Sequence, residues 1–205
     1  MKYRIIFLLS FIISTANFSY AENHVISPEF REDFETAVKN VENKEFVEAV
    51  EIFKKLANQG VPEAQFNLAL LNNNGLGTPK NFKMALYWSW YAHLNKHPTA
   101  LSQVTKIYES ITENLRDTVA NEIVEELLLS ANKGDELSTL KLGQTYTGLL
   151  VVPDYQSAYL WLSIAQAYGI EEASELLAQA AKQLTMEEIL AQQEQAASKF
   201  LEINS

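Results

Sequence analysis

The sequence predicts an all-α fold in which about five helix hairpins follow one another as a solenoid. Apolar residues recur at i, i+3 and i+4 over nearly all of the chain after residue 27, and no segment alternates with period two for long. The second half of the chain also repeats the first half after about 73 residues, which is two hairpin units of about 36 residues each. Residues 22–205 are therefore expected to form a single repeat domain.

The expected helices follow one another with short polar joints. The first begins with Ser27 as N-cap, Pro28 at the first helical position and Glu29 beside the positive end of the helix dipole. Thr185 and Glu188 form the capping-box pattern that opens the last helix. The pattern predicts helices near 28–41, 44–58, 62–73, 80–95, 98–110, 113–131, 135–147, 153–168, 171–183 and 186–200.

The internal similarity has two well-matched parts. Residues 56–70 align with 130–144, and residues 75–92 align with 148–165. The second alignment pairs Trp88 with Trp161, and we expect both indole rings to fill the space between hairpins, where they stabilise the fold. Gly77 has no glycine counterpart in the second copy, so the loop between the two helices is expected to differ there.

The repeat pattern identifies a family resemblance. Its features are Ala-x-x-Gly, Ala-x-x-x-Leu, a Gly-Leu-Gly-x-Pro-Lys-Asn-Phe joint and Ala-x-x-Trp-x-x-x-Ala, and the clearest copies lie at 57–92 and 131–165, the second with a different joint. This pattern resembles the Sel1-like repeat, a relative of the tetratricopeptide repeat. The resemblance implies a right-handed, tetratricopeptide-like solenoid, an adaptor or regulatory role in the cell envelope, and no cofactor.

The first 21 residues have the pattern of a secretory signal peptide. Lys2 and Arg4 precede an apolar run from Ile5 to Ile13, and small residues stand at the −3 and −1 positions of a cleavage site after Ala21. The run is too short to span a bilayer, although an uncleaved signal anchor stays an alternative. We therefore expect a periplasmic or secreted protein with no membrane span after cleavage. The absence of cysteine argues against a lipoprotein anchor and against disulfides.

The charge balance disfavours two classes of partner. The signal segment holds two of the 16 basic residues and none of the 26 acidic ones, so residues 22–205 carry a net charge near −12. Nucleic acids and anionic membrane surfaces attract basic proteins, and neither is an expected partner of this chain. A hydrophobic content of 47% indicates a globular chain that is long enough to bury a core without disulfides.

No residue pattern indicates catalysis or metal binding. His93 and His97 have the i, i+4 spacing of a metal pair, but Pro98 follows and no third ligand is evident. The adjacent glutamates, such as Glu125-Glu126, lie in helical patterns and are explained as solvated faces. We therefore expect neither an enzyme nor a bound metal or cofactor.

Partner binding is the function class that the pattern favours. In tetratricopeptide-like arrays the first helix of each hairpin lines the concave groove, so the repeat register nominates groove positions in both copies. Packing between helices explains the same positions equally well. Trp90 and Tyr91 do not recur as aromatic residues in the second copy, which makes them further candidates. The expected partner-binding residues are Phe66, Leu70, Asn74, Leu140, Gln144, Trp90 and Tyr91, with Glu63, Leu137 and Thr147 completing the groove positions.

The sequence thus predicts an exported scaffold or adaptor of the bacterial cell envelope that binds a protein or peptide. Its partner is not identified by any motif. One rival is an envelope hydrolase, which would need a cluster of carboxylates or a Ser/His pair within hydrogen-bond reach. Another is a secreted factor that acts on a host or a competitor.

Overall fold

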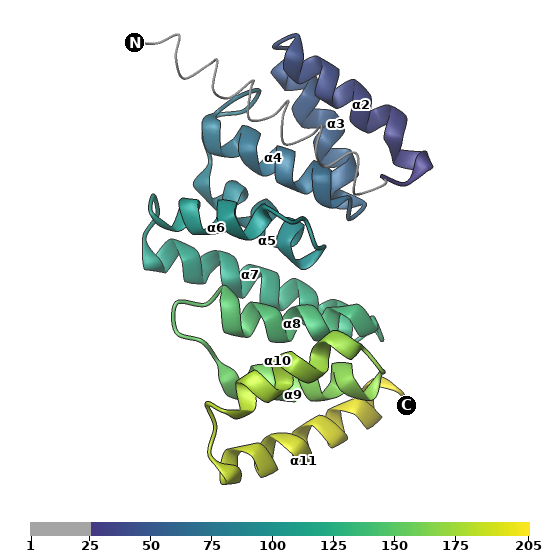
Figure 1. Ribbon diagram of the computed structural model, residues 1–205, viewed down its shortest axis with the longest axis vertical. Helices are drawn as coiled ribbons and strands as arrows, with labels where there is room; N and C mark the ends of the chain where they lie inside the picture. Colours follow the sequence, from purple (N-terminus) through teal and green to yellow (C-terminus); the bar gives the residue numbers. More distant parts are fainter. Residues whose placement is uncertain (1–25) are drawn as a thin grey trace. The chain divides into compact units, whose positions relative to one another are not determined.

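The computed structural model describes residues 26–205, and every regular element in that range is a helix. The signal segment predicted at residues 1–21 lies outside the described residues. The helices are α2 (Pro28–Glu42), α3 (Phe46–Asn58), α4 (Pro62–Asn74), α5 (Phe82–Leu94), α6 (Ala100–Tyr108), α7 (Glu113–Ala131), α8 (Glu136–Gly148), α9 (Tyr155–Ala167), α10 (Glu171–Ala181) and α11 (Met186–Ile203) (Figure 1). The all-α class is confirmed, and none of these helices is long and apolar enough to cross a membrane.

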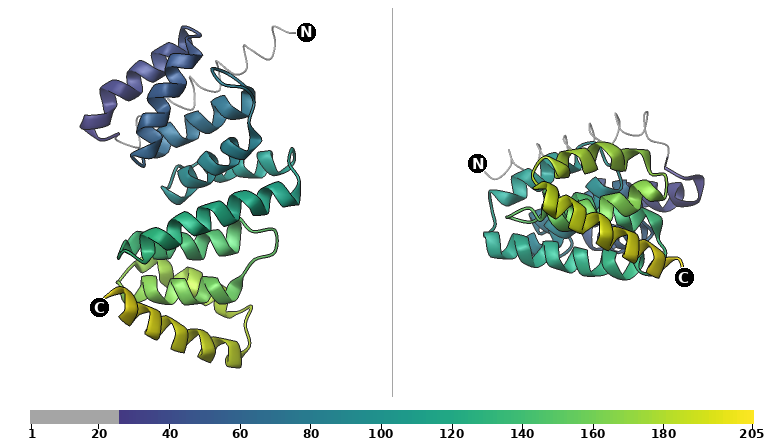
Figure 2. Two further views of the ribbon diagram at one scale, coloured as in Figure 1. Left: turned by 180° about the vertical axis from the view of Figure 1, so that it is seen from behind. Right: turned by 90° about the horizontal axis from the view of Figure 1, so that it is seen from below.

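The described chain forms two compact units, of which unit 1 ends at Ala100 and unit 2 begins at Leu101. In unit 1 each helix packs against the next, from α2 to α5. In unit 2, α8 packs against α7 and α9, and both α10 and α11 pack on α9 (Figure 2). Packing between sequence neighbours is the arrangement expected of helical repeats.

Each unit has its own apolar core. In unit 1, Phe34 and Phe53 meet edge to face with ring centroids 5.6 Å apart, and Leu56, Leu68 and Trp88 belong to the same buried cluster. In unit 2, a second cluster joins α8, α9 and α10 through residues such as Leu140, Ala158, Leu162 and Ala173. The small residues let the helices approach closely, as the repeat pattern predicts.

The helix ends follow the sequence signals with one exception. Thr185 and Glu188 form the expected capping box, in which Thr185 Oγ1 accepts from the Glu188 amide and the Glu188 carboxylate accepts from the Thr185 amide. Ser27 occupies the N-cap position of α2, but its side chain makes no capping bond and its hydroxyl donates to Glu29 Oε1 at 3.5 Å. The predicted Ser27 cap is therefore correct in position and wrong in its hydrogen bond.

The loops between the two helices of each repeat are held differently in the two copies. In the first copy, Gly75 and Gly77 both adopt positive φ, at 69° and 71°. In the second copy, Arg116 donates from Nε to the Leu149 carbonyl at 2.7 Å and from its terminal nitrogen to the Leu150 carbonyl at 2.9 Å. The Asp117 carboxylate accepts from the Val151 amide at 2.9 Å. The sequence predicted that the two loops differ where the second copy lacks a counterpart of Gly77. The structure confirms this, because side chains of α7 hold the loop of the second copy.

Replacing Arg116 with alanine is expected to lower the free energy of unfolding by about 1.5–3 kcal/mol, the range for hydrogen bonds to charged groups. The guanidinium also lies over the Tyr108 ring, 4.1 Å from its centroid. Arg116→Lys keeps the charge but loses the fork that reaches adjacent carbonyls, so it should resemble alanine more than wild type. Urea titration of the three proteins checks this, and a lysine variant as stable as wild type would contradict it.

Candidate functional site

The accessible face of α4 contains three of the predicted partner-binding residues. Phe66, Leu70 and Asn74 are spaced by four, which places them along one side of the helix, and their exposure rises from half-buried to exposed at Asn74. The Phe66 ring stacks on His97 with centroids 4.0 Å apart and an angle of 12° between the planes. The Asn74 amide donates to the Leu70 carbonyl at 2.7 Å. The structure therefore brings these three residues together on the surface of unit 1.

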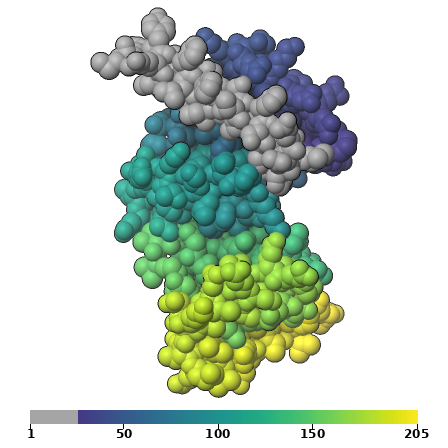
Figure 3. All heavy atoms as spheres, viewed as in Figure 1, coloured from purple at the N-terminus to yellow at the C-terminus, as the bar shows by residue number. Residues whose placement is uncertain are grey.

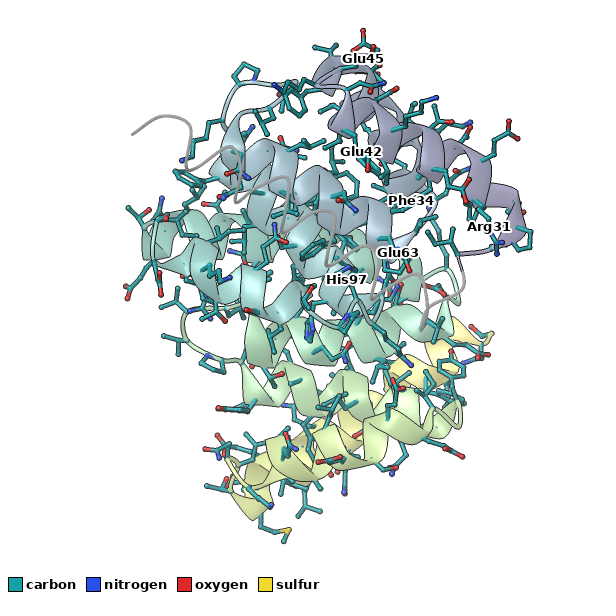
Figure 4. The ribbon with its side chains drawn as sticks, turned by 45° about the horizontal axis from the view of Figure 1, so that its top comes forward. Arg31, Phe34, Glu42, Glu45, Glu63 and His97 are labelled. Atoms are coloured by element: carbon teal, nitrogen blue, oxygen red, sulfur yellow. The ribbon has the colours of Figure 1, made fainter. Side chains whose placement is uncertain are left out.

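Near the N-terminal end of the same helix, Glu63 is buried and lines a shallow pocket of about 230 Å³ with Ile26, Phe30 and Gln59. Figure 4 shows Glu63 and His97 in the same part of unit 1. The His97 ring is buried as well, and its Nδ1 lies 3.4 Å from the Thr99 hydroxyl. Glu63 and His97 are thus both buried from solvent.

The accessible face of α8 is a narrow stripe. Leu137, Lys141 and Gln144 lie on one side of the helix at i, i+4 and i+7, while the flanking residues Ser138 and Leu140 are buried. Leu137 is 56% exposed, although it is a large apolar residue in the first turn of the helix. The Gln144 side-chain oxygen is buried and has no hydrogen-bond partner among the described residues. This stripe of Leu137, Lys141 and Gln144 is the α8 face.

Burial also affects the charged residue of the α8 face. Desolvation lowers the pKa of Lys141, and the nearby Asp135 carboxylate opposes this shift. A lysine with little water around it holds its charge less strongly than one in solvent. The α8 face thus combines an exposed leucine with a partly buried lysine and a partly buried amide side chain.

Two predicted partner-binding residues are corrected by the structure. Leu140 is only 5% exposed and belongs to the core of unit 2 together with Ala158 and Leu162, so the packing alternative holds for it. Trp90 is 1% exposed, with its ring 4.9 Å from that of His93. Trp90 has no aromatic counterpart in the second copy, and this difference reflects internal packing, because the ring is buried. Neither side chain is available to a partner.

Tyr91 lies between these cases. It is half-buried and packs against the core of unit 1 beside Tyr87, with ring centroids 5.0 Å apart, and beside Trp88, at 6.4 Å. Most of the aromatic cluster around residues 82–91 is therefore core.

The sequence pattern did not predict the exposure of Leu129, which is 63% exposed near the end of α7.

The residues considered for chemistry are not assembled into a site in the described part of the chain. No group of three or more metal-ligating side chains occurs among residues 26–205. Ser89 lies four residues before His93 on α5, and its buried hydroxyl makes no hydrogen bond. His97 stacks on Phe66 instead of facing a second ligand.

His93 is expected to make the stability of the protein depend on pH. Burial lowers the pKa of His93, whereas the unfolded histidine titrates near 6.5. Below that pH the unfolded chain binds a proton that the folded chain resists, so stability is complete above about 6.5 and falls as the pH drops toward the folded value. The urea midpoint of the wild type should therefore fall more between pH 7 and pH 5 than that of His93→Gln. Equal falls would contradict this assignment.

Comparisons with known proteins agree with the repeat register. The family model of the Sel1 repeat matches residues 62–89 and 137–165. One similar solved structure is a protective antigen of uropathogenic Escherichia coli strains that displays an SLR fold; it is 22% identical, with 76% of this chain and 41% of that chain covered and a TM-score of 0.33. Another is a Sel1 repeat protein from Oxalobacter formigenes, 23% identical, with 83% and 73% covered and a TM-score of 0.39.

This chain thus spans less than half of the length of the Escherichia coli protein. No curated protein sequence gives a significant match.

Proposed function

We propose that this chain, two segments of which match the Sel1 repeat, is a scaffold that binds a protein or peptide partner through the α8 face. Sel1 repeats generally mediate protein–protein interaction, and their fold is typically non-catalytic. The observation that carries the proposal is the 56% exposure of Leu137, a large apolar side chain on the same side of α8 as Lys141 and Gln144. An exposed leucine on the same side of the helix as two polar side chains offers a peptide an apolar anchor with polar groups along the same face.

The α4 face supports the same function less directly. Phe66 and Leu70 offer apolar surface, but Phe66 already stacks on His97 and Asn74 already donates to its own helix. The α8 face therefore carries the main contact in this proposal, and the α4 face is a second contact on unit 1.

The proposed place of action is outside the cytoplasm, in the periplasm or beyond it. Its support is the charged start at Lys2 and Arg4, the apolar run, and the small residues before position 22. Cell fractionation followed by N-terminal sequencing tests this. The expected mature protein begins at Glu22 in the exported fraction, and a cytoplasmic protein that retains Met1 would contradict the proposal.

The binding proposal is tested by affinity capture from envelope extract with the mature chain and with Leu137→Gln. Removing an interface anchor typically costs more than 1 kcal/mol, so the variant should retain a specific partner about tenfold less well. The matched control is Val152→Gln, which changes an even more exposed apolar residue of unit 2, 79% exposed, outside the α8 face. Equal capture by all three proteins would overturn the assignment of the α8 face.

A further inference from the structure

The helix α11 exposes an apolar stripe that the fold does not use. Met186 is 68% exposed, Leu190 55% and Leu201 69%, and Ala197 is exposed between the last two. Their spacing of i, i+4, i+11 and i+15 places all four on one side of the helix. At 1.5 Å per residue the stripe is about 22 Å long. We call these four residues the α11 stripe.

The contacts that hold α11 in unit 2 come from another side of the helix. Gln192 and Ala196 are buried, Ile189 packs against the core cluster, and Phe200 meets Tyr168 with ring centroids 5.0 Å apart. α11 packs on α9, and the view from below shows α11 nearest the viewer within its unit (Figure 2). The space-filling view shows α11 atoms, in yellow, at the surface of unit 2 (Figure 3). The α11 stripe is therefore not needed to attach the helix.

An acidic row runs along one edge of the α11 stripe. Glu187, Glu194 and Glu202 are all exposed, and helical geometry places them beside Met186, Leu190 and Leu201 on the side away from the core. The one basic residue of α11, Lys199, lies on the opposite side of the helix from the stripe, and its ammonium pairs with Glu202 at 2.9 Å. The stripe thus combines exposed leucine and methionine with carboxylates along the edge that faces solvent.

We propose that the α11 stripe docks an amphipathic helix of a partner protein whose apolar face is bordered by lysine or arginine. Apolar anchors in two pairs, each pair spaced by one helical turn and the pairs by two turns, match the face of such a helix, and the acidic row matches its basic edge. A second copy of this chain fits less well, because it would bring its own acidic row against this one. The net charge of residues 22–205, near −12, also favours a basic partner.

The test uses two synthetic helical peptides with the same leucine stripe, one bordered by lysine and the other by glutamate. Binding to the full chain is followed by fluorescence anisotropy at low and high salt. The lysine peptide is expected to bind, more weakly at high salt, and the glutamate peptide is not. Leu190→Gln with Leu201→Gln should weaken the lysine peptide by about tenfold or more. Because Leu190 and Leu201 are exposed, this variant should stay folded, and circular dichroism checks that it does.

Charge specificity needs its own comparison, because any basic peptide is attracted to an acidic protein. Glu187→Gln with Glu194→Gln should weaken the lysine peptide and reduce its salt dependence. The matched control is Glu125→Gln with Glu171→Gln, which removes the same charge from exposed positions on α7 and α10. Equal effects of the two pairs, equal binding of the two peptides, or no binding at all would each overturn the proposal. So would dimerisation of the chain that Leu190→Gln abolishes. The affinity-capture experiment with Leu137→Gln tests only the α8 face. Its outcome, whatever it is, leaves the proposal for the α11 stripe standing.

Discussion

Trp88→Ala and Trp161→Ala are each expected to lower the free energy of unfolding by about 3–5 kcal/mol. Trp88 is 8% exposed within the core of unit 1, and Trp161 is 5% exposed on α9 of unit 2. The two rings occupy corresponding slots of the two repeats, so their removal leaves a similar cavity in each unit. Urea titration followed by circular dichroism measures both losses.

The matched controls are Trp88→Phe and Trp161→Phe. Phenylalanine keeps an aromatic ring in each slot, so these variants should lose clearly less stability than the alanine variants. A loss of less than about 1 kcal/mol for both alanine variants would show that the repeat tryptophans do not hold the units together.

Gly77→Ala is expected to cost about 3 kcal/mol or more, because backbone strain and steric overlap add together. Gly77 has a φ of 71°, which disfavours any residue with a Cβ atom. The added Cβ would also overlap the carbonyl group of Phe46 and lie 2.9 Å from the Val47 nitrogen, both of them backbone atoms at the start of α3. Backbone cannot rotate away as the end of a flexible side chain can.

Gly60→Ala separates the two causes. Gly60 has a similar φ of 82°, but a Cβ atom there would meet no atom within 4 Å. Its variant should show the cost of the left-handed backbone alone, about 1–2 kcal/mol. Equal losses for the two glycine variants in a urea titration would mean that the approach of Gly77 to α3 contributes nothing.

The fold was predictable because its signals are local and repeated. Apolar periodicity located the ten helices of residues 26–205 to within a few residues, and the capping box at Thr185 was read from two residues alone. The repeat register paired Trp88 with Trp161, and the structure buries both. The loop after α8 was expected to differ, but nothing in the sequence indicated that Arg116, over 30 residues earlier, would hold it.

The candidate site was only partly predictable, because exposure depends on which other helices cover a position. Phe66 and Leu140 occupy the same repeat slot, yet Phe66 is half-buried against His97 and Leu140 is in the core of unit 2. Trp90 looked like a departure from the repeat and is buried. Conversely, Leu190 and Leu201 fit the helical pattern of a buried face, and only the packing of α11 on α9 shows that they are exposed.

The most direct test of the scaffold function is photo-cross-linking in living cells with a photoreactive phenylalanine analogue at position 137. Position 47 on α3 is the control, because Val47 is exposed to a similar extent and lies outside the α8 face. The account predicts a discrete cross-linked protein from position 137 that is absent from position 47. The same products from both positions, or none from position 137, would contradict it.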